Sequence, residues 1–268
     1  MSIPQITHQI WLQGWDSIPD KFKVNVKSLE EVNPDFKHMK WDESSLRDEC
    51  AKISPAVQEK FDSFKYLIQK VDLGRYVVLY NYGGISVDTD MLSFKTISKA
   101  PGFKENDFII SYSAFPANTI GWVNNALIMC KQYHPIILEL ILNITKTNLH
   151  ENDFLTKELY IDATTSPSKF NEIVYKNRKD TLILDNKYFE PCFSVDIFCR
   201  PSRESIMDHK HELSWFHGNL KVLAQIIIIL IYLLIFIFLP VLIFFISRWL
   251  LLKIYSRHVK RLLISILL

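Results

Sequence analysis

The sequence predicts an α/β domain followed by one helix that crosses a membrane. Segments with the pattern of strands alternate with segments of helical periodicity as far as Leu184. Apolar residues make up 49% of the chain, and most of their excess lies after Lys221. The 268 residues allow one sizeable folded domain with appendages, and neither an internal repeat nor a low-complexity linker divides them.

Two strands and two helices are expected before the first functional motif. Ile6–Trp11 is a short apolar run and Phe36–Trp41 alternates, so both read as strands. Ile18–Val32 carries apolar side chains at helical spacing. Phe64–Tyr82 has the clearest helical apolar face of the soluble part, and Gly83-Gly84 should end it.

The next strand, Ile85–Val87, delivers Asp88-Thr89-Asp90 at its C-terminal end, where open α/β sheets bind their ligands. Further alternation completes the expected domain. We expect strands at Phe108–Tyr112, Trp122–Cys130 and Thr181–Leu184, and helices at Pro135–Ile144 and Pro167–Lys176.

The segment Val222–Ile246 contains twenty-five residues without a charge. At about 1.5 Å per residue it is long enough to cross a hydrocarbon core of ~30 Å. A buried core helix, the alternative, rarely runs so far without a polar stripe. We therefore expect a transmembrane helix over residues 222–247, kinked at Pro240.

The charges are unevenly distributed around this span. Five of the 31 basic residues follow it and none of the 29 acidic residues does, which leaves residues 1–221 with a net charge of −3. An acidic main domain argues against a nucleic acid partner. The positive-inside rule places the basic tail, residues 248–268, in the cytosol on anionic lipid headgroups. The tail reads as an interfacial amphipathic helix, and a second short membrane segment is the alternative.

The chain opens without the continuous apolar region of a signal peptide, so we expect the C-terminal span to direct targeting. The four cysteines show neither a CxxC pair nor a spacing suited to zinc. Buried thiols are expected, with a Cys192–Cys199 disulfide as the alternative.

Asp88 and Asp90 are the first candidate site residues. Two carboxylates one residue apart at a strand end can jointly hold a hard divalent cation that bridges phosphates. Such a pair alone is also common in solvated surface turns. Here it ends a longer string, Asp72-x2-Arg75-x7-Gly83-Gly84-x3-Asp88-x-Asp90, which is far more specific.

The stretch VDLGRYVVLYNYGGISVDTD resembles the signature of glycosyltransferase family 32. This DXD-motif family includes initiating mannosyltransferases, inositol-phosphoceramide mannosyltransferases and capsular sugar transferases, with the large clostridial glucosylating toxins more distant. IPQITHQIWLQG, NPDFKHMKWD and HELSWFHGN are similar to the family's first strand, second strand and terminal His and Ser-Trp motif. The resemblance covers most of residues 3–219 and implies a GT-A type, Rossmann-like fold.

The resemblance also implies roles for these residues. Asp88 and Asp90 would bind Mn²⁺ or Mg²⁺ together with the sugar diphosphate. Asp72 and Arg75 would contact the donor sugar or ribose and act with the pair in catalysis; an exposed i,i+3 ion pair is the alternative. Trp11 would stack on the nucleotide base, or simply pack in the core.

Near the other end, His209 lies six residues before Trp215, the spacing of the family's late metal-binding or phosphate-binding histidine. His211 is its close competitor, and Trp215 would shield the diphosphate or pack. Two positions depart from the family pattern. Ser86 replaces an aromatic residue, and Ser166 replaces a glycine whose backbone freedom serine lacks.

The resemblance thus implies a metal-dependent, retaining transferase that moves a hexose, mannose favoured, from a nucleotide-diphosphate sugar such as GDP-mannose. A membrane lipid or glycan, for example an inositol-phosphoceramide, would accept it, in the Golgi or another endomembrane if the chain is of eukaryotic type. No protein partner can be named. An aspartyl-phosphate phosphatase is one alternative, but Leu92 stands where that motif expects Thr or Val. A non-catalytic sugar-binding protein is the other.

Overall fold

The computed structural model describes residues 2–193, 199–212, 226–227 and 229–267. The chain divides into two compact units, Met1–Trp215 and Phe216–Leu268. The predicted domain border at residue 221 falls outside the described residues.

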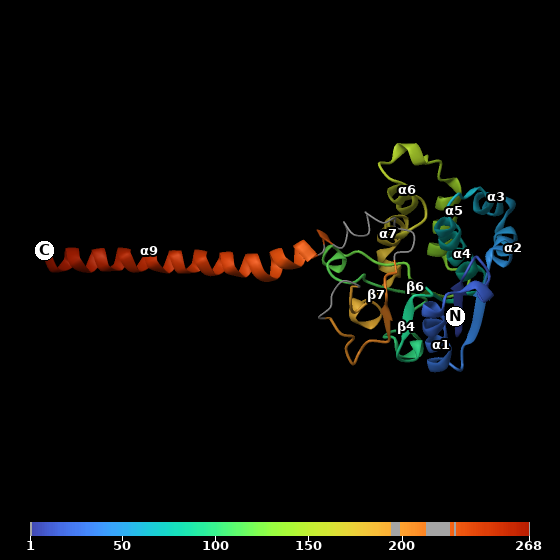
Figure 1. Ribbon diagram of the computed structural model, residues 1–268, viewed down its shortest axis with the longest axis horizontal. Coiled ribbons are helices and arrows are strands. Elements are labelled where there is room, and N and C mark those ends of the chain that lie inside the picture. Colours follow the sequence, from blue (N-terminus) through green and yellow to red (C-terminus); the bar gives the residue numbers. More distant parts are fainter. Residues whose placement is uncertain (1, 194–198, 213–225, 228, 268) are drawn as a thin grey trace. The chain divides into compact units, whose positions relative to one another are not determined.

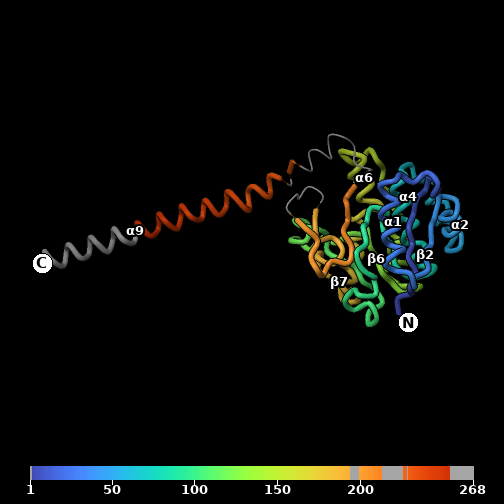
Figure 2. The backbone as a smooth tube through the Cα atoms, turned by 60° about the horizontal axis from the view of Figure 1, so that its bottom comes forward, coloured from blue at the N-terminus to red at the C-terminus, as the bar shows by residue number. Residues whose placement is uncertain are grey.

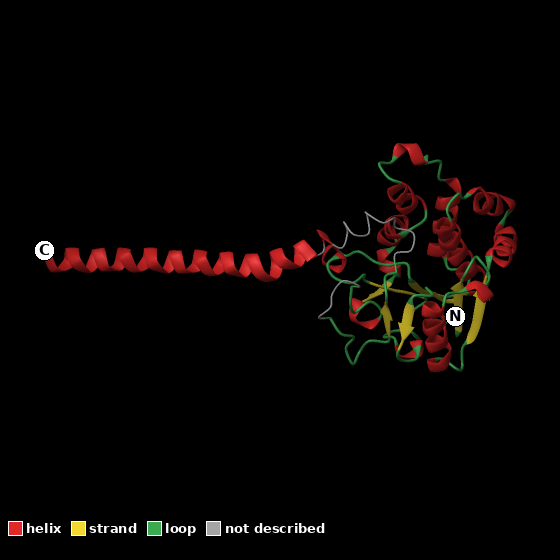
Figure 3. Ribbon diagram, viewed as in Figure 1, coloured by secondary structure: helices red, strands yellow, loops and turns green. Residues whose placement is uncertain are grey.

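A six-stranded mixed sheet in the order β2-β1-β3-β6-β5-β7 forms the centre of the first unit (Figure 3). β1 is parallel to both β2 and β3, and β5 is parallel to β7, whereas β6 is antiparallel to β3 and β5. A second, two-stranded sheet pairs β4 with β8. The strands are β1 Ile6–Ile10, β2 Lys37–Trp41, β3 Gly84–Val87, β4 Met91–Ser93, β5 Phe108–Ser111, β6 Leu127–Cys130, β7 Leu182–Leu184 and β8 Met207–His209.

Helices cover both faces of the six-stranded sheet, as Figure 1 shows. The α-helices of this unit are α1 Asp20–Val32, α2 Glu43–Ile53, α3 Pro55–Ser63, α4 Leu67–Tyr82, α5 Pro135–Lys146, α6 Lys157–Thr164 and α7 Pro167–Lys176. Single 3₁₀ turns lie at Trp15–Ser17, Ile97–Lys99, Ala117–Ile120, Glu151–Asp153, Arg178–Asp180 and Asn186–Tyr188. The α/β class expected from the sequence is confirmed.

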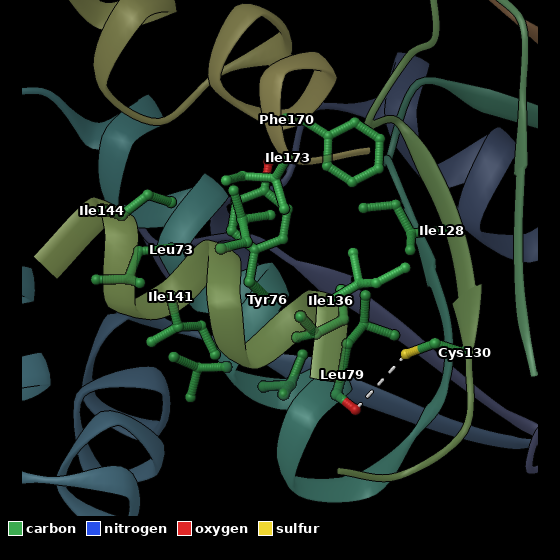
Figure 4. Close-up of a cluster of buried hydrophobic side chains, with 14 of the residues drawn as sticks. Leu73, Tyr76, Leu79, Ile128, Cys130, Ile136, Ile141, Ile144, Phe170 and Ile173 are labelled. Atoms are coloured by element: carbon green, nitrogen blue, oxygen red, sulfur yellow. Dashed lines mark hydrogen bonds between the residues drawn. The ribbon is translucent and has the colours of Figure 1, made fainter. Parts of the chain in front are cut away.

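On one face of the sheet, α4, α5 and α7 pack together in the larger hydrophobic cluster (Figure 4). Tyr76 of α4 stacks on Phe170 of α7 with ring centroids 6.1 Å apart. Each large apolar side chain removed from water in this way contributes about 1.5–3 kcal/mol. The other face is closed by α1 and the two-stranded sheet, through Leu29, Met91 and Met207. Both sheets are therefore held by buried apolar layers.

Gly83 and Gly84 form the turn between α4 and β3, with φ values of 64° and 97°. A Cβ on Gly84 would lie 2.4 Å from the Ile6 carbonyl oxygen, so only glycine fits between β3 and β1. His8 of β1 braces the turn because its Nε2 donates to the Gly83 carbonyl at 2.8 Å. Its Nδ1 accepts from the indole nitrogen of Trp41 at 3.2 Å.

Most predicted boundaries lie within two residues of the observed ones, and two differ by more, each at the start of a predicted element. The predicted helix Phe64–Tyr82 starts only at Leu67, because Phe64 is the extended C-cap of α3. The predicted strand Trp122–Cys130 forms ladder bonds only from Leu127, and Val123 makes an isolated bridge to Tyr112. The helices α2, α3 and α6 were not predicted.

The expectation of four thiols is wrong for one pair. Cys192 and Cys199 form a disulfide with Cα atoms 5.6 Å apart. Sequence spacing does not reveal whether two cysteines approach within the range that a disulfide requires. Cys50 and Cys130 are buried free thiols, as expected.

The second unit contains an apolar helical segment, Ile229–Lys253, of 25 residues and mean hydropathy 3.2, none of it buried. Its length and composition suit a membrane span, and it overlaps the predicted span 222–247, whose first residues, 222–225, lie outside the described residues. A π-helical turn at Leu234–Phe238 directly precedes α9, Leu239–Leu267 (Figure 2). Pro240, which lacks an N–H to donate, lies just after this turn, at the second residue of α9. α9 continues through the predicted tail without a break.

Candidate active site

Asp88 and Asp90 lie at the carboxyl end of β3, beside the parallel strand β1. The chain places β2 on one side of β1 and β3 on the other, and ligands of open α/β sheets bind where the strand order reverses in this way. The loop is anchored by the Asp88 backbone N–H, which donates to the Ala126 carbonyl at 2.9 Å. β4 then leaves the loop and pairs with β8, which sets Met91 opposite His209.

This pairing gathers Asp88, Asp90 and His209 into one cluster. The three residues offer ligand atoms that all lie within 4.8 Å of one another. His209 Nε2 is 3.2 Å from Asp90 Oδ1. The side chain of Asp88 is 30% exposed, whereas those of Asp90 and His209 are 14% and 9% exposed, so the cluster opens at Asp88.

Two carboxylates and an imidazole form a ligand set that suits Mn²⁺, with Mg²⁺ served by the carboxylates alone. The cluster therefore fits the divalent cation expected from the sequence. Such a cation would supply Lewis-acid stabilisation of a diphosphate leaving group.

The three side chains perturb one another strongly. Burial raises the pKa of Asp88 to about 7, with the Asp90 carboxylate adding to the rise and Arg75 opposing it. Burial acts in the same direction on Asp90, but His209 and the Glu212 backbone N–H hold the pKa of Asp90 well below its usual range. The carboxylates of Asp90 and Glu190 in turn raise the pKa of His209 well above 6.5, against the effect of burial.

Asp72 and Arg75 lie behind this cluster on α4, and each is only 2% exposed. The alternative of an exposed ion pair is therefore wrong. One terminal nitrogen of Arg75 donates to Asp88 Oδ1 at 2.5 Å, and the other donates to the Asn125 carbonyl. The same guanidinium is 4.0 Å from Asp72 Oδ1. Arg75 thus links the two carboxylates, and a direct contact of this pair with a donor sugar stays a prediction.

Asp72 is held by neutral donors from two distant loops. Asn125 Nδ2 donates to Oδ1 at 3.0 Å, while Ser166 Oγ and Thr165 Oγ1 donate to Oδ2 at 2.6 and 3.2 Å. Burial raises the pKa of Asp72 to about 6, and Arg75 and these hydrogen bonds limit the rise. The concern that serine at position 166 would resist the required backbone is unfounded, because Ser166 is extended at φ −86° and ψ −162°. Its hydroxyl instead holds Asp72 through the hydrogen bond to Oδ2.

Trp11 directly follows β1 at the same edge of the sheet. Its ring packs on Phe22 with centroids 5.2 Å apart, and its Nε1 donates to Ser17 Oγ at 3.2 Å. The indole is half-buried. Stacking on a nucleotide base stays a prediction. Trp215 lies outside the described residues.

Glu190 was not predicted from the sequence. It belongs to the site although it lies far from Asp88 and Asp90 along the chain. It is 2% exposed, and its Oε1 lies 3.3 Å from His209 Nδ1. Asn125 was also missed. Neither residue belongs to a recognisable local pattern, since only the folded chain brings them to the cluster. Of the two competing histidines, His209 is the one beside Asp88 and Asp90, and His211 faces Glu190.

Known proteins of one functional class are similar to this chain. Residues 19–115 match the glycosyltransferase sugar-binding region containing the DXD motif. The chain is 29% identical over 197 residues to a glycosyltransferase of Acanthamoeba polyphaga mimivirus, an alignment that covers 71% of this chain and 74% of the viral protein. Inositol phosphoceramide mannosyltransferase 3 of Schizosaccharomyces pombe is 31% identical over 147 residues. These matches support a glycosyltransferase and agree with the resemblance of the chain to the DXD-motif family.

The fold of this chain agrees with that of a solved glycosyltransferase domain. The ligand-free glycosyltransferase domain from the YGT toxin superposes with a TM-score of 0.53 at 10% identity, over 84% of this chain and 85% of the toxin domain. The GT-A type fold expected from the sequence is confirmed. The phosphatase and non-catalytic alternatives find no support among these matches. The alignment with the S. pombe enzyme covers 54% of this chain but only 38% of the enzyme, so the chain spans less than half of that relative.

Proposed function

We propose that this glycosyltransferase is metal-dependent and transfers mannose, with retention of configuration, from GDP-mannose to a membrane-associated acceptor. The supporting observation is the convergence of Asp88, Asp90 and His209 from two separate elements on one cluster of ligand atoms. The favoured acceptor is an inositol-phosphoceramide glycolipid, and a glycan is the wider class.

In this proposal the charged side chains divide the work. Asp88, Asp90 and His209 hold the cation that neutralises the sugar diphosphate. Arg75, fixed on Asp88, adds positive charge in a poorly solvated pocket, where a preorganised charge stabilises the developing phosphate most effectively. The acceptor hydroxyl would attack on the face that the nucleotide leaves, with the leaving phosphate taking its proton.

The donor and acceptor rest on two further observations. The S. pombe relatives that match over about half of this chain are inositol phosphoceramide mannosyltransferases. The apolar helix Ile229–Lys253 is long enough to tether the site at a bilayer. We place the basic tail in the cytosol and the catalytic domain on the lumenal or outer side, in a Golgi or other endomembrane.

A screen of the purified full chain against GDP-mannose, UDP-glucose and UDP-galactose, with and without Mn²⁺, tests the activity. We expect hydrolysis of GDP-mannose only when Mn²⁺ or Mg²⁺ is present, and transfer when inositol-phosphoceramide vesicles are added. If a UDP-sugar is turned over and GDP-mannose is not, the assignment of GDP-mannose as the donor is wrong. The absence of turnover from every donor would overturn the proposed activity.

Topology needs a separate measurement. In sealed vesicles, protease added from the cytosolic side should leave the catalytic domain intact. Its digestion from that side would refute the lumenal placement.

A further inference from the structure

A second group of metal-binding side chains adjoins the candidate active site. Glu190, His209 and His211 are all buried, and their ligand atoms lie within 4.8 Å of one another. Glu190 ends the segment before the Cys192–Cys199 disulfide, whereas the two histidines flank the end of β8. His209 is shared with the cluster of Asp88 and Asp90.

His211 carries two features that its packing does not explain. Its Nε2 is buried and has no hydrogen-bond partner among the described residues, while the backbone of Cys192 hydrogen-bonds the ring. The residue is also in the left-handed region at φ 47°, which side chains other than glycine seldom adopt. This backbone turns the imidazole back onto His209, with ring centroids 4.0 Å apart. Strain and an unused nitrogen at one residue indicate a ligand.

The separation between Glu190 and His211 is too long for a direct hydrogen bond. Glu190 Oε1 hydrogen-bonds His209 Nδ1 at 3.3 Å, whereas Glu190 Oε2 lies 3.9 Å from His211 Nε2. Hydrogen bonds to nitrogen are usually about 2.7–3.2 Å long. A tetrahedral Zn²⁺ bound at roughly 2.0–2.2 Å from each ligand atom separates those atoms by about 3.4 Å. Two imidazoles and one carboxylate form a familiar zinc ligand set.

We propose that Glu190, His209 and His211 form a second metal site, for Zn²⁺ or a similar transition metal, and that it competes with the Asp88–Asp90 site for His209. The imidazole of His209 presents Nε2 to Asp90 and Nδ1 to Glu190. A neutral imidazole has one lone pair, so it ligates one cation at a time. Zinc on Nδ1 leaves a proton on Nε2, which then donates to Asp90 instead of binding Mn²⁺. The site itself stands on geometry alone, and the competition rests on the proposed function.

Co²⁺, whose tetrahedral complexes absorb visible light, is the probe for the site. The measurement uses the full chain carrying Asp88→Asn and Asp90→Asn, which remove the two carboxylates of the first site. We expect this protein to bind one Co²⁺ that Zn²⁺ displaces. Adding His211→Asn, a residue that tolerates the left-handed backbone, should weaken binding at least tenfold. The matched control His150→Asn removes an exposed histidine and should leave binding unchanged.

Equal Co²⁺ affinity with and without His211 would overturn the site. If His211→Asn alters the thermal unfolding curve, Glu190→Gln in the same background provides the same comparison, and unchanged affinity there would also overturn it.

The competition is measured as the affinity of otherwise unaltered protein for Mn²⁺. One equivalent of zinc should weaken Mn²⁺ binding several-fold more in the wild type than in His211→Asn, because direct displacement of Mn²⁺ by zinc acts on both proteins. An equal effect of zinc on both proteins would refute the competition. Failure of the proposed function remains distinguishable, because no nucleotide sugar would be consumed while His211-dependent Co²⁺ binding persisted.

Discussion

The carboxylates of the site fall into two groups that have different hydrogen-bond partners. Asp72 forms the inner end of the site, and Asp88 and Asp90 form its outer end. At the inner end, Asp72 takes its hydrogen bonds from neutral groups of Asn125, Thr165 and Ser166, and the Arg75 guanidinium lies 4.0 Å away. At the outer end, Asp88 is paired with Arg75, and Asp90 is paired with His209 and also accepts the Glu212 backbone N–H. The hydrogen bonds of Asp72 can persist whether or not a cation is bound. At the outer end, a cation can replace the proton on His209. The inner end therefore serves as a support and the outer end as a binding site.

The strongest test of this division is Asp90→Asn. The amide keeps the size of the carboxylate but removes a charged ligand, so turnover of the nucleotide sugar should fall about 10³-fold. The measurement is kcat/KM for GDP-mannose at saturating Mn²⁺. Asp20→Asn, at an exposed carboxylate on α1, is the control and should retain full activity. Near-normal turnover by Asp90→Asn would place the cation elsewhere.

The outer end should also bind Mn²⁺ more tightly as the pH rises. The pKa of His209 is raised well above 6.5 by Asp90 and Glu190, and burial raises the pKa of Asp88 to about 7. A cation must displace the protons these groups carry at low pH. The affinity should therefore rise about tenfold per pH unit for each proton released, between pH 6 and 8. Calorimetric titration with Mn²⁺ across this range measures it, and a flat profile would contradict the assignment of these ligands.

His8, which hydrogen-bonds the Gly83 carbonyl, should make the free energy of unfolding depend on pH. Burial lowers the pKa of His8 from 6.5 to about 4. Between pH 4 and 6.5, His8 is protonated in the unfolded chain and neutral in the folded chain. The free energy of unfolding therefore falls as the pH drops from 6.5 to 4. The loss at this residue is about 3 kcal/mol, because one pKa unit corresponds to about 1.4 kcal/mol.

Asp72 acts with the opposite sign over part of that range, since its folded pKa is raised to about 6. The free energy of unfolding is therefore compared between wild type and His8→Gln at each pH. The wild type should lose the larger amount on acidification. Parallel pH profiles would show that His8 is not the responsible group.

The Asp88 and Asp90 pair could be predicted from the sequence, whereas the hydrogen-bond partners of Asp72 could not. A strand that ends in Asp88-x-Asp90 after a double glycine is a local pattern, and the helix with Asp72 and Arg75 precedes it directly. The partners of these residues are set by long-range packing. Asn125 lies 53 residues from Asp72, and Ser166 lies 94 residues away. Periodicity carries no information about such pairs.

The same limit explains the errors about the cysteines and Glu190. The Cys192–Cys199 pair depends on the path of a loop, and Glu190 reaches His209 only after β8 has paired with β4. The β-pairing itself was not foreseen, because three-residue strands leave too short a pattern to read.

Ser166→Ala gives the smallest expected effect and tests the inner end. Alanine fits the extended backbone but removes the 2.6 Å hydrogen bond to Asp72 Oδ2. A hydrogen bond to a charged, buried group stabilises the fold by about 1.5–3 kcal/mol, and Thr165 Oγ1 remains on the same oxygen, so a loss near the lower value is expected. Urea unfolding measures it, with Ser44→Ala at an exposed serine of α2 as the control. If the inner end is a support, Mn²⁺ affinity stays within about twofold of wild type, since a hydrogen bond this far from the cation changes no ligand. A large loss of Mn²⁺ affinity without a loss of stability would make Ser166 part of the binding site and erase the distinction between the two ends.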